Sequence, residues 1–259
     1  MYVDSHCHLG FAELHEHVAE IRAAMAAARV SRALCICTSL EEFPRVHALA
    51  LAHDNLWATV GVYPDSEGVA EPQRADLVAR ARLPRVVGIG ETGLDYFRTR
   101  DPDGIARQKH SFAAHIALAK QHGLALAIHD RDSHDDVLDV LDAEGAPERV
   151  MMHCFSGDAD FARRCLDRGF WLSFPGPVTF KPNEPLREAL DVTPTDRLLV
   201  ETDAPYLTPM PLRGKPNAPY LLPHTVRFIA DRRGTDVAEL CHQLAANATA
   251  LFGDWGSDD

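Results

Sequence analysis

Short apolar segments recur along the chain, and stretches with apolar residues at helical spacing separate most of them. Continuous apolar segments of this length are typical of strands in a parallel sheet whose two faces are both covered. Eight segments fit this description. They are residues 2–9, 33–37, 56–62, 86–90, 124–128, 150–152, 170–174 and 198–202.

The spacing of apolar residues also predicts helices in the segments that connect these strands. The first helix is expected at about residues 13–29, where Ile21 and Met25 stand four positions apart. A longer helix is expected over residues 103–123, with Gly123 as its stop signal. Further helices are predicted at residues 41–53, 219–232 and 235–251.

Alternating strands and helices predict an α/β protein, and eight such units predict a closed (β/α)8 barrel of the TIM type. The length of 259 residues suits this fold, which typically takes about 250 residues as one domain. An open, doubly wound sheet is the structural rival, but no Gly-rich phosphate loop follows the first strand. We therefore expect a single barrel domain over residues 1–259.

Composition and charge narrow the classes of protein that fit. Hydrophobic residues make up 46% and charged residues 25% of the chain, and no apolar run approaches the roughly 20 residues that cross a bilayer. The first residues carry no signal-peptide pattern, so we expect a cytoplasmic protein without membrane association, and a monomer. The six cysteines form no Cys-x-x-Cys pair, which favours reduced thiols.

The formal net charge is −12, from 26 basic and 38 acidic residues. This balance argues against a protein that coats duplex nucleic acid through a broad basic face. It does not argue against a nuclease that holds one strand end, because bound divalent metals supply local positive charge.

Histidine and acidic residues stand at the ends of several predicted strands. His6 and His8 end the first strand, where side-chain alternation places both imidazoles on one face. The carboxyl ends of barrel strands form the rim that carries active sites, so these residues are expected to converge there. The candidate metal ligands are His6, His8, Glu91, His129, His153 and Asp203.

A lone histidine or aspartate at a strand end is more often a hydrogen-bonded rim residue than a ligand, but six such residues at one rim favour a metal site. Four imidazoles and two carboxylates suit two divalent ions, such as Zn, Mn, Mg or Ni. We expect His6, His8 and Asp203 on one ion, His129 and His153 on the other, and Glu91 between them. The catalytic candidates are Asp203, as general base, and Glu91.

Five sequence blocks resemble the TatD family of metal-dependent deoxyribonucleases, which are amidohydrolase-like TIM barrels. The blocks are VDSHCHL (3–9), GETGLDY (90–96), IHDRD (128–132), HCFSG (153–157) and ETDAPYL (201–207). The resemblance covers nearly the whole chain, and the metal-ligand positions of the family fall on the six candidate residues. It implies metal-dependent hydrolysis of DNA phosphodiester bonds by a metal-activated water, with 3′–5′ exonuclease action on single strands or 3′ ends.

The chain departs from the family pattern at three places. Tyr63 stands where the family has the histidine of Gly-Val-His-Pro, and residues 216–219 read Pro-Asn-Ala-Pro in place of Arg-Asn-Glu-Pro, with Ala218 at the acidic position. Gly10 replaces the Asp or Asn that follows the first block. The six candidate ligands are kept, but changes at the rim bear on substrate preference and on exonuclease polarity.

Two residues are candidate substrate contacts. Arg131 can clamp a phosphate through two parallel hydrogen bonds, although an ion pair with a neighbouring aspartate (Asp132, Asp135 or Asp136) fits it about equally well. Tyr63 can stack on a base or hold a phosphate, and rim packing is an equal alternative.

Other residues near the strand ends are expected to support the ligands. Glu201 and Asp95 are candidates for orienting the imidazoles. His115, on the predicted helix 103–123, is expected at the surface.

Two other functions fit parts of the pattern. A metal-dependent hydrolase of small-molecule esters, amides or phosphoesters would use the same ligands. The fourth strand ends in Glu91 and not in a lysine, which disfavours the subtype with a carbamylated lysine. A non-catalytic metal or nucleic-acid binding protein is disfavoured because all six expected positions are filled.

Overall fold

The structure is a computed structural model and describes residues 1–65, 74–253 and 255. Its eight strands are all parallel, and each is hydrogen-bonded to the next in chain order. The strands are β1 (Tyr2–Cys7), β2 (Val30–Cys35), β3 (Leu56–Val60), β4 (Val86–Asp95), β5 (Ala125–Arg131), β6 (Val150–Met152), β7 (Trp171–Phe174) and β8 (Leu198–Val200). Just past β8, the N–H of Asp203 donates to the carbonyl of His6 at 3.0 Å, which brings the last strand back to the first.

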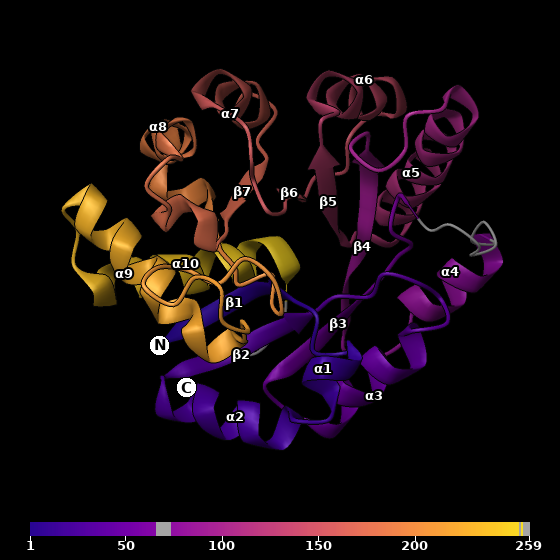
Figure 1. Cartoon of the computed structure of the whole chain (residues 1–259). Helices are drawn as coiled ribbons and strands as arrows, with labels where there is room; N and C mark the ends of the chain where they lie inside the picture. Colours follow the sequence, from indigo (N-terminus) through magenta and orange to yellow (C-terminus); the bar gives the residue numbers. More distant parts are fainter. Residues whose placement is uncertain (66–73, 254, 256–259) are drawn as a thin grey trace.

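Helices surround this barrel on the outside (Figure 1). Those between β1 and β5 are α1 (Ala12–His15), α2 (Val18–Ala27), α3 (Phe43–Ala52), α4 (Arg74–Ala81) and α5 (Pro102–His122). Those after β5 are α6 (His134–Glu144), α7 (Ala159–Leu166), α8 (Glu184–Val192), α9 (Leu222–Arg233) and α10 (Val237–Phe252). Three short 3₁₀ turns complete the description: η1 (Gly176–Thr179), η2 (Thr195–Arg197) and η3 (Pro219–Leu221).

The fold is therefore the predicted (β/α)8 barrel. Its core lies where the continuous apolar segments are, because every residue of β3, β4, β6, β7 and β8 is buried. Side chains that face inward fill the barrel, and those that face outward pack under the helices. The single-domain interpretation of residues 1–259 stays a prediction.

The fourth strand is longer than predicted, and Glu91 lies within it and not at its end. β4 runs on to Asp95, and its pairing with β5 shifts register between Ile89 and Thr92. Gly90 has a φ of +142° in this irregular stretch, and a Cβ there would lie 2.6 Å from the carbonyl oxygen of Ala127. The close approach of β5 therefore requires glycine, and the irregularity sets the position of Glu91.

Two local predictions are wrong. The segment expected as one helix at 13–29 forms α1 and α2, because His17 has a non-helical backbone (φ −114°). His115 is fully buried on α5 and not at the surface. Its Nδ1–H donates to the carbonyl of Ser111 at 2.7 Å, and its Nε2 accepts from the N–H of Val62 at 3.1 Å. These two hydrogen bonds compensate the burial of the imidazole.

All six cysteines have free thiols. Among the described residues, the helices are too short or too polar for any of them to span a bilayer.

Candidate active site

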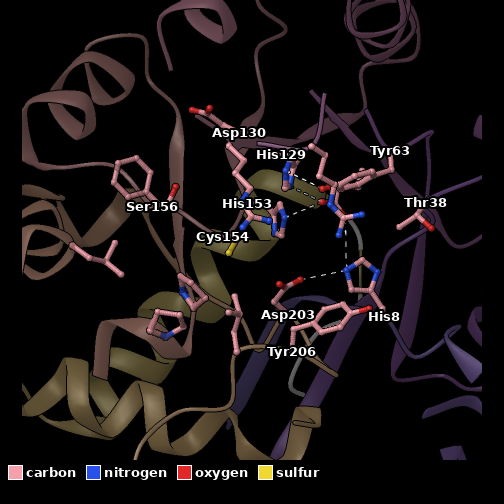
Figure 2. A pocket seen from close by; sticks show the side chains of 18 of the residues that line it. His8, Thr38, Tyr63, His129, Asp130, His153, Cys154, Ser156, Asp203 and Tyr206 are labelled. Carbon is pink, nitrogen blue, oxygen red and sulfur yellow. Dashed lines mark hydrogen bonds and ion pairs between the residues drawn. The ribbon is translucent and has the colours of Figure 1, made fainter. Parts of the chain in front are cut away.

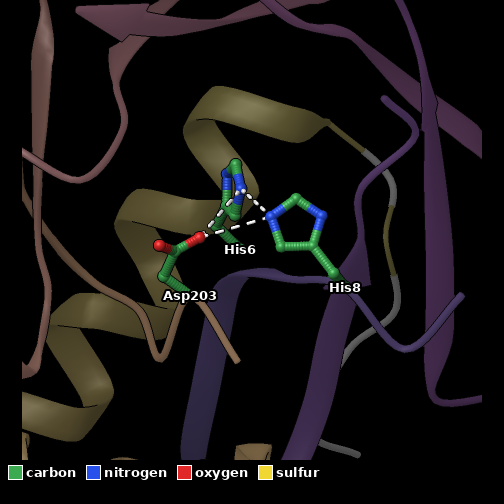
Figure 3. A group of neighbouring side chains, drawn as sticks. All are labelled: His6, His8 and Asp203. Atoms are coloured by element: carbon green, nitrogen blue, oxygen red, sulfur yellow. Dashed lines mark hydrogen bonds and ion pairs between the residues drawn. The ribbon is translucent and has the colours of Figure 1, made fainter. Parts of the chain in front are cut away.

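Three side chains meet at the carboxyl ends of β1 and β8. Oδ1 of Asp203 lies 3.6 Å from Nε2 of His6 and 3.3 Å from Nε2 of His8. The two Nε2 atoms are 3.3 Å apart. Figure 3 shows the three side chains directed at one another. The structure thus brings the predicted His-x-His pair together with a carboxylate that lies about 200 positions further along the chain.

Glu91, His129 and His153 form a second group beside the first. They come from β4, from β5 and from the position directly after β6. Oε1 of Glu91 lies 3.1 Å from Nδ1 of His129 and 3.1 Å from Nε2 of His153. Figure 2 shows His129 and His153 close together among the side chains that line the pocket.

The carboxylate of Glu91 connects the two groups. Its second oxygen, Oε2, lies 3.5 Å from Nε2 of His6 and 3.6 Å from Nε2 of His8. The rings of His6 and His153 are also stacked, with centroids 3.6 Å apart. All six predicted residues therefore belong to one cluster, in which one Glu91 oxygen faces each group.

Two of the imidazoles are held from behind by a carboxylate. Nδ1–H of His153 donates to Oε1 of Glu201 at 3.0 Å, and Nε2–H of His129 donates to Oδ2 of Asp95 at 3.1 Å. The expected positions of Glu201 and Asp95 behind the imidazoles agree with these contacts. Each bond leaves the other ring nitrogen as a lone pair that faces Glu91, which is the arrangement of a metal-ligating histidine.

The donor atoms fit divalent cations. Ring nitrogens with lone pairs face anionic oxygens at 3.1–3.6 Å, so each such pair needs a proton or a cation between its two atoms. Two of the compact groups that can hold an ion are His6 with His8 and Asp203, and Glu91 with His129 and His153. Nδ1 of His6 and Nδ1 of His8 are buried without a hydrogen-bond partner among the described residues. The two groups thus differ in how well their imidazoles are supported.

The electrostatics keep both carboxylates of the cluster ionised. Burial acts to raise the pKa of Glu91, but the imidazoles of His153, His129 and His6 outweigh it and hold this pKa well below its ordinary value. Burial likewise opposes ionisation of Asp203, and the hydrogen bond and charge of His8 together with nearby imidazoles lower its pKa. Two anionic oxygen donors therefore face the imidazoles.

Asp4 fastens the ends of β1 and β8 to each other. Its Oδ1 accepts from the N–H of Thr202 at 3.0 Å, and its Oδ2 accepts from the hydroxyl of Thr202 at 2.6 Å. The N–H of His6 donates to the same Oδ1 at 3.3 Å. One buried carboxylate therefore fixes the backbones that carry His6 and Asp203.

Tyr63 lies against the second group. Its hydroxyl donates to Oδ2 of Asp95 at 2.7 Å and lies 3.1 Å from Nε2 of His129. Burial acts to raise the pKa of Asp95, but the hydrogen bonds from His129 and Tyr63 outweigh it and lower this pKa to about 2. In this chain a tyrosine thus makes contact with the imidazole support where the TatD pattern has a histidine.

Packing explains Gly10, whereas no contact among the described residues explains the changes at Pro216 and Ala218. A Cβ on Gly10 would lie 2.7 Å from Cγ2 of Val46, so close packing of α3 excludes a larger residue. The side-chain amide of Asn217 donates to the carbonyls of Thr202 and Tyr206, which ties the loop at Ala218 to the segment that carries Asp203. Ala218 itself is buried.

A cavity of about 1030 Å³ opens above the cluster. Glu91, His129, His153 and Asp203 lie at its base, and Arg131 and Tyr63 line it as well. One wall is apolar. It is formed by Phe155, Pro175, Pro177, Pro182, Pro185, Leu186 and Leu207.

The sequence reasoning missed Arg98 and this apolar wall. Arg98 follows the block 90–96, and its backbone N–H donates to Oδ1 of Asp95 at 2.9 Å. Its place directly after the block is the signal that could have found it. The prolines of the wall stand between the end of β7 and the first turn of α8, and nothing in their spacing indicates that they face the cavity.

The structure also places Arg131. Its guanidinium lies over the ring of Phe97, 3.8 Å from the centroid. Within the described part of the chain it has no ion pair with Asp132, Asp135 or Asp136, so the alternative of a rim ion pair is wrong.

Comparison with known proteins identifies the family. A family model described as TatD related DNase matches residues 3–253. The chain belongs to the TatD family. A relative in Mycobacterium tuberculosis, named "Uncharacterized metal-dependent hydrolase TatD", is 42% identical over 257 residues, and the match covers 97% of both proteins.

Two further matches agree with this membership. A Citrobacter rodentium protein named "3'-5' ssDNA/RNA exonuclease TatD" is 39% identical over 243 residues, which cover 90% of this chain and 91% of that protein. The crystal structure of YJJV, a TatD homologue from Escherichia coli, superimposes with a TM-score of 0.90 at 28% identity and 97% coverage of both chains. The chain is therefore a metal-dependent hydrolase of the TatD family.

Proposed function

We propose that this TatD-family hydrolase cleaves phosphodiester bonds of single-stranded DNA, removing nucleotides from the 3′ end with two divalent ions at its site. The observation that carries the proposal is the position of Glu91, whose two oxygens face two separate sets of imidazoles. The name of the Citrobacter rodentium relative supports a nucleic-acid substrate and this polarity.

We assign the ligands in two groups. His6, His8 and Asp203 would hold one ion, His129 and His153 would hold the other, and Glu91 would offer one oxygen to each group. When bound there, two divalent ions would supply a coordinated water of lowered pKa and would stabilise charge on the phosphate. Histidine and carboxylate donors accept Zn, Mn, Mg or Ni, so the metal that the site takes depends on availability.

The side chains of the protein supply the proton transfer and the orientation. Asp203 has a pKa below its ordinary value and a side chain that is 13% exposed, so it is an ionised base that the attacking water can reach. We assign it as the general base, which accepts the proton of that water. Asp95 and Glu201 keep His129 and His153 in the tautomers that direct lone pairs at the ions.

Two side chains of the cavity are assigned to the substrate side. Arg131 donates hydrogen bonds to a phosphate of the strand. Tyr63 acts through Asp95 and His129, which its hydroxyl contacts, and is a positioning residue. A cytoplasmic location and a monomeric state stay predictions.

The direct experiment is digestion of single-stranded DNA labelled at either end, with the purified protein and Mn²⁺ or Mg²⁺. We expect stepwise shortening from the 3′ end, which is lost in His129→Ala and in Asp203→Ala. Glu188→Gln is the matched control, because Glu188 is an exposed acidic residue of α8 that does not line the cavity. Digestion that persists in both site variants contradicts the proposal.

The apolar wall of the cavity favours a second candidate, a hydrolase of small-molecule esters, amides or phosphoesters. An apolar lining with few polar groups is typical of small-ligand pockets. A panel of such compounds distinguishes the two functions. Turnover of any member faster than that of DNA would favour the second.

A further inference from the structure

Arg131 lines the cavity, and its guanidinium lies over the ring of Phe97. The guanidinium carbon of Arg131 lies 3.8 Å from the centroid of the Phe97 ring. The Phe97 side chain is large, apolar and 50% exposed, so its ring is open to a ligand. Phe97 itself is not part of the cavity lining, so the pair joins a residue of the cavity to an aromatic ring on the exposed surface beside it.

The β4–β5 ladder fixes this pair relative to the metal-ligand candidates. Gly93 pairs with His129 and Asp95 pairs with Arg131. His129 and Arg131 are two residues apart on β5, so their side chains leave the same face, about 7 Å apart along the strand. The N–H of Tyr96 donates to the carbonyl of Arg131 at 2.9 Å, which holds the end of the strand in place. Arg131 therefore lies two residues beyond His129, at the carboxyl end of β5 and on the same face of the strand.

The guanidinium edge is available for a ligand. Two of the nearby acidic side chains already have other partners: Asp135 pairs with Arg164, and Asp136 pairs with Lys109. Within the described ranges, no hydrogen bond or ion pair of the Arg131 side chain is found. Arg98, the other arginine of the cavity wall, lies 3.8 Å from carboxylate oxygens of both Asp65 and Asp95.

We propose that Arg131 and Phe97 form a subsite for the nucleotide next to the one that is cleaved. The inference rests on the proposed nuclease function. The guanidinium edge binds a phosphate of the strand, and the planar faces of the pair stack on an unpaired base. Stacking on aromatic rings and on arginine is how proteins hold single strands without reading their sequence. Bases inside a duplex are already stacked on their neighbours, so the subsite favours single strands.

The test compares two substrates that differ in whether they reach this subsite. A short single-stranded oligonucleotide extends past the metal cluster, whereas bis(p-nitrophenyl) phosphate supplies one phosphodiester with no neighbouring nucleotide. KM and kcat are measured for both substrates with Mn²⁺ in the wild type, Phe97→Leu, Phe97→Tyr and Arg131→Ala. Arg197→Ala is the control. Arg197 lies over the ring of Trp171, the first residue of β7, and neither residue lines the cavity, so this variant also removes an arginine from an aromatic ring but away from the site.

We expect Phe97→Leu to raise KM for the oligonucleotide about fivefold or more, which corresponds to the loss of one stacked base. The rise in KM for the oligonucleotide exceeds the rise in KM for bis(p-nitrophenyl) phosphate. Phe97→Tyr keeps the wild-type KM for both substrates because it keeps the ring. Arg131→Ala raises the KM for the oligonucleotide further, since it removes the charge as well.

The outcomes separate the two proposals. If Phe97→Leu and Arg131→Ala change both substrates by the same factor, or change neither, the pair has only a structural role and the subsite is wrong. Turnover of bis(p-nitrophenyl) phosphate also reports whether each variant is folded. A wild-type protein that hydrolyses bis(p-nitrophenyl) phosphate but not the oligonucleotide contradicts the nuclease function itself, and the subsite with it.

Discussion

The buried imidazole of His115 makes the stability of the fold depend on pH in a way that one substitution can isolate. Its Nε2 accepts from the N–H of Val62, which requires the neutral ring, and its Nδ1–H donates to the carbonyl of Ser111, which the neutral and the protonated ring can both do. Burial lowers the pKa of His115 from 6.5 to about 4, with the hydrogen bond to Ser111 acting in the opposite direction. Between pH 6.5 and pH 4 the ring is therefore protonated in the unfolded chain but neutral in the folded protein.

The magnitude follows from the two pKa values. Above pH 6.5 the ring is neutral in both states and its contribution to stability is complete. As the pH falls from 6.5 to 4, only the unfolded chain is protonated, and the free energy of unfolding decreases. The difference of about 2.5 pKa units corresponds to about 3 kcal/mol over the whole interval, of which about 2 kcal/mol is lost by pH 5.

Urea denaturation at pH 7.5 and pH 5, for the wild type and for His115→Gln, measures this contribution. The variant is less stable at pH 7.5, by about 1–3 kcal/mol, because the N–H of Val62 loses its acceptor. Between pH 7.5 and pH 5 the free energy of unfolding of the variant decreases by about 2 kcal/mol less than that of the wild type. His110→Gln, at an exposed position of the same helix, keeps the wild-type dependence. Equal pH dependence in His115→Gln and the wild type would refute the reasoning.

Three further predictions concern the site. Asp95→Asn removes the carboxylate behind His129 and lowers metal affinity about 10–100-fold. Calorimetric titration measures this affinity, with Asp103→Asn at an exposed position as the control. An unchanged affinity in Asp95→Asn would contradict the role of Asp95. Asp203→Asn lowers kcat at least about 100-fold with any metal, and a variant that keeps wild-type kcat excludes Asp203 as general base. Gly93→Ala, whose Cβ would overlap the carbonyl of His129, lowers the free energy of unfolding by about 3 kcal/mol. The same change at Gly123, where the space is open, costs about 1–2 kcal/mol, so equal losses would contradict the close approach of β4 and β5.

The barrel was predictable because its strands are buried on both faces and therefore leave continuous apolar segments in the sequence. The convergence of His6, His8 and Asp203 was predictable for a related reason, since parallel strands place their carboxyl ends at one rim. The position of Glu91 inside β4 was not predictable from these rules. It depends on a register shift against β5 that a periodic pattern does not contain.

Contacts between residues far apart in the sequence were also missed, although Arg131 itself was a predicted substrate contact. His115 looks like a surface residue of a helix, but it is buried, and its ring accepts from the N–H of Val62 just past β3. Phe97 and Arg131 lie in separate segments, and only the β4–β5 register brings them into contact. Such pairs depend on the tertiary structure, which local spacing does not encode.

The central claim is that one carboxylate, that of Glu91, bridges two metal ions. Anomalous diffraction from crystals soaked in Mn²⁺ tests it most directly. We expect two peaks about 3.5–4 Å apart, one beside His6, His8 and Asp203 and the other beside His129 and His153, with one Glu91 oxygen on each. A single peak, or a Glu91 side chain directed away from both positions, would contradict the account.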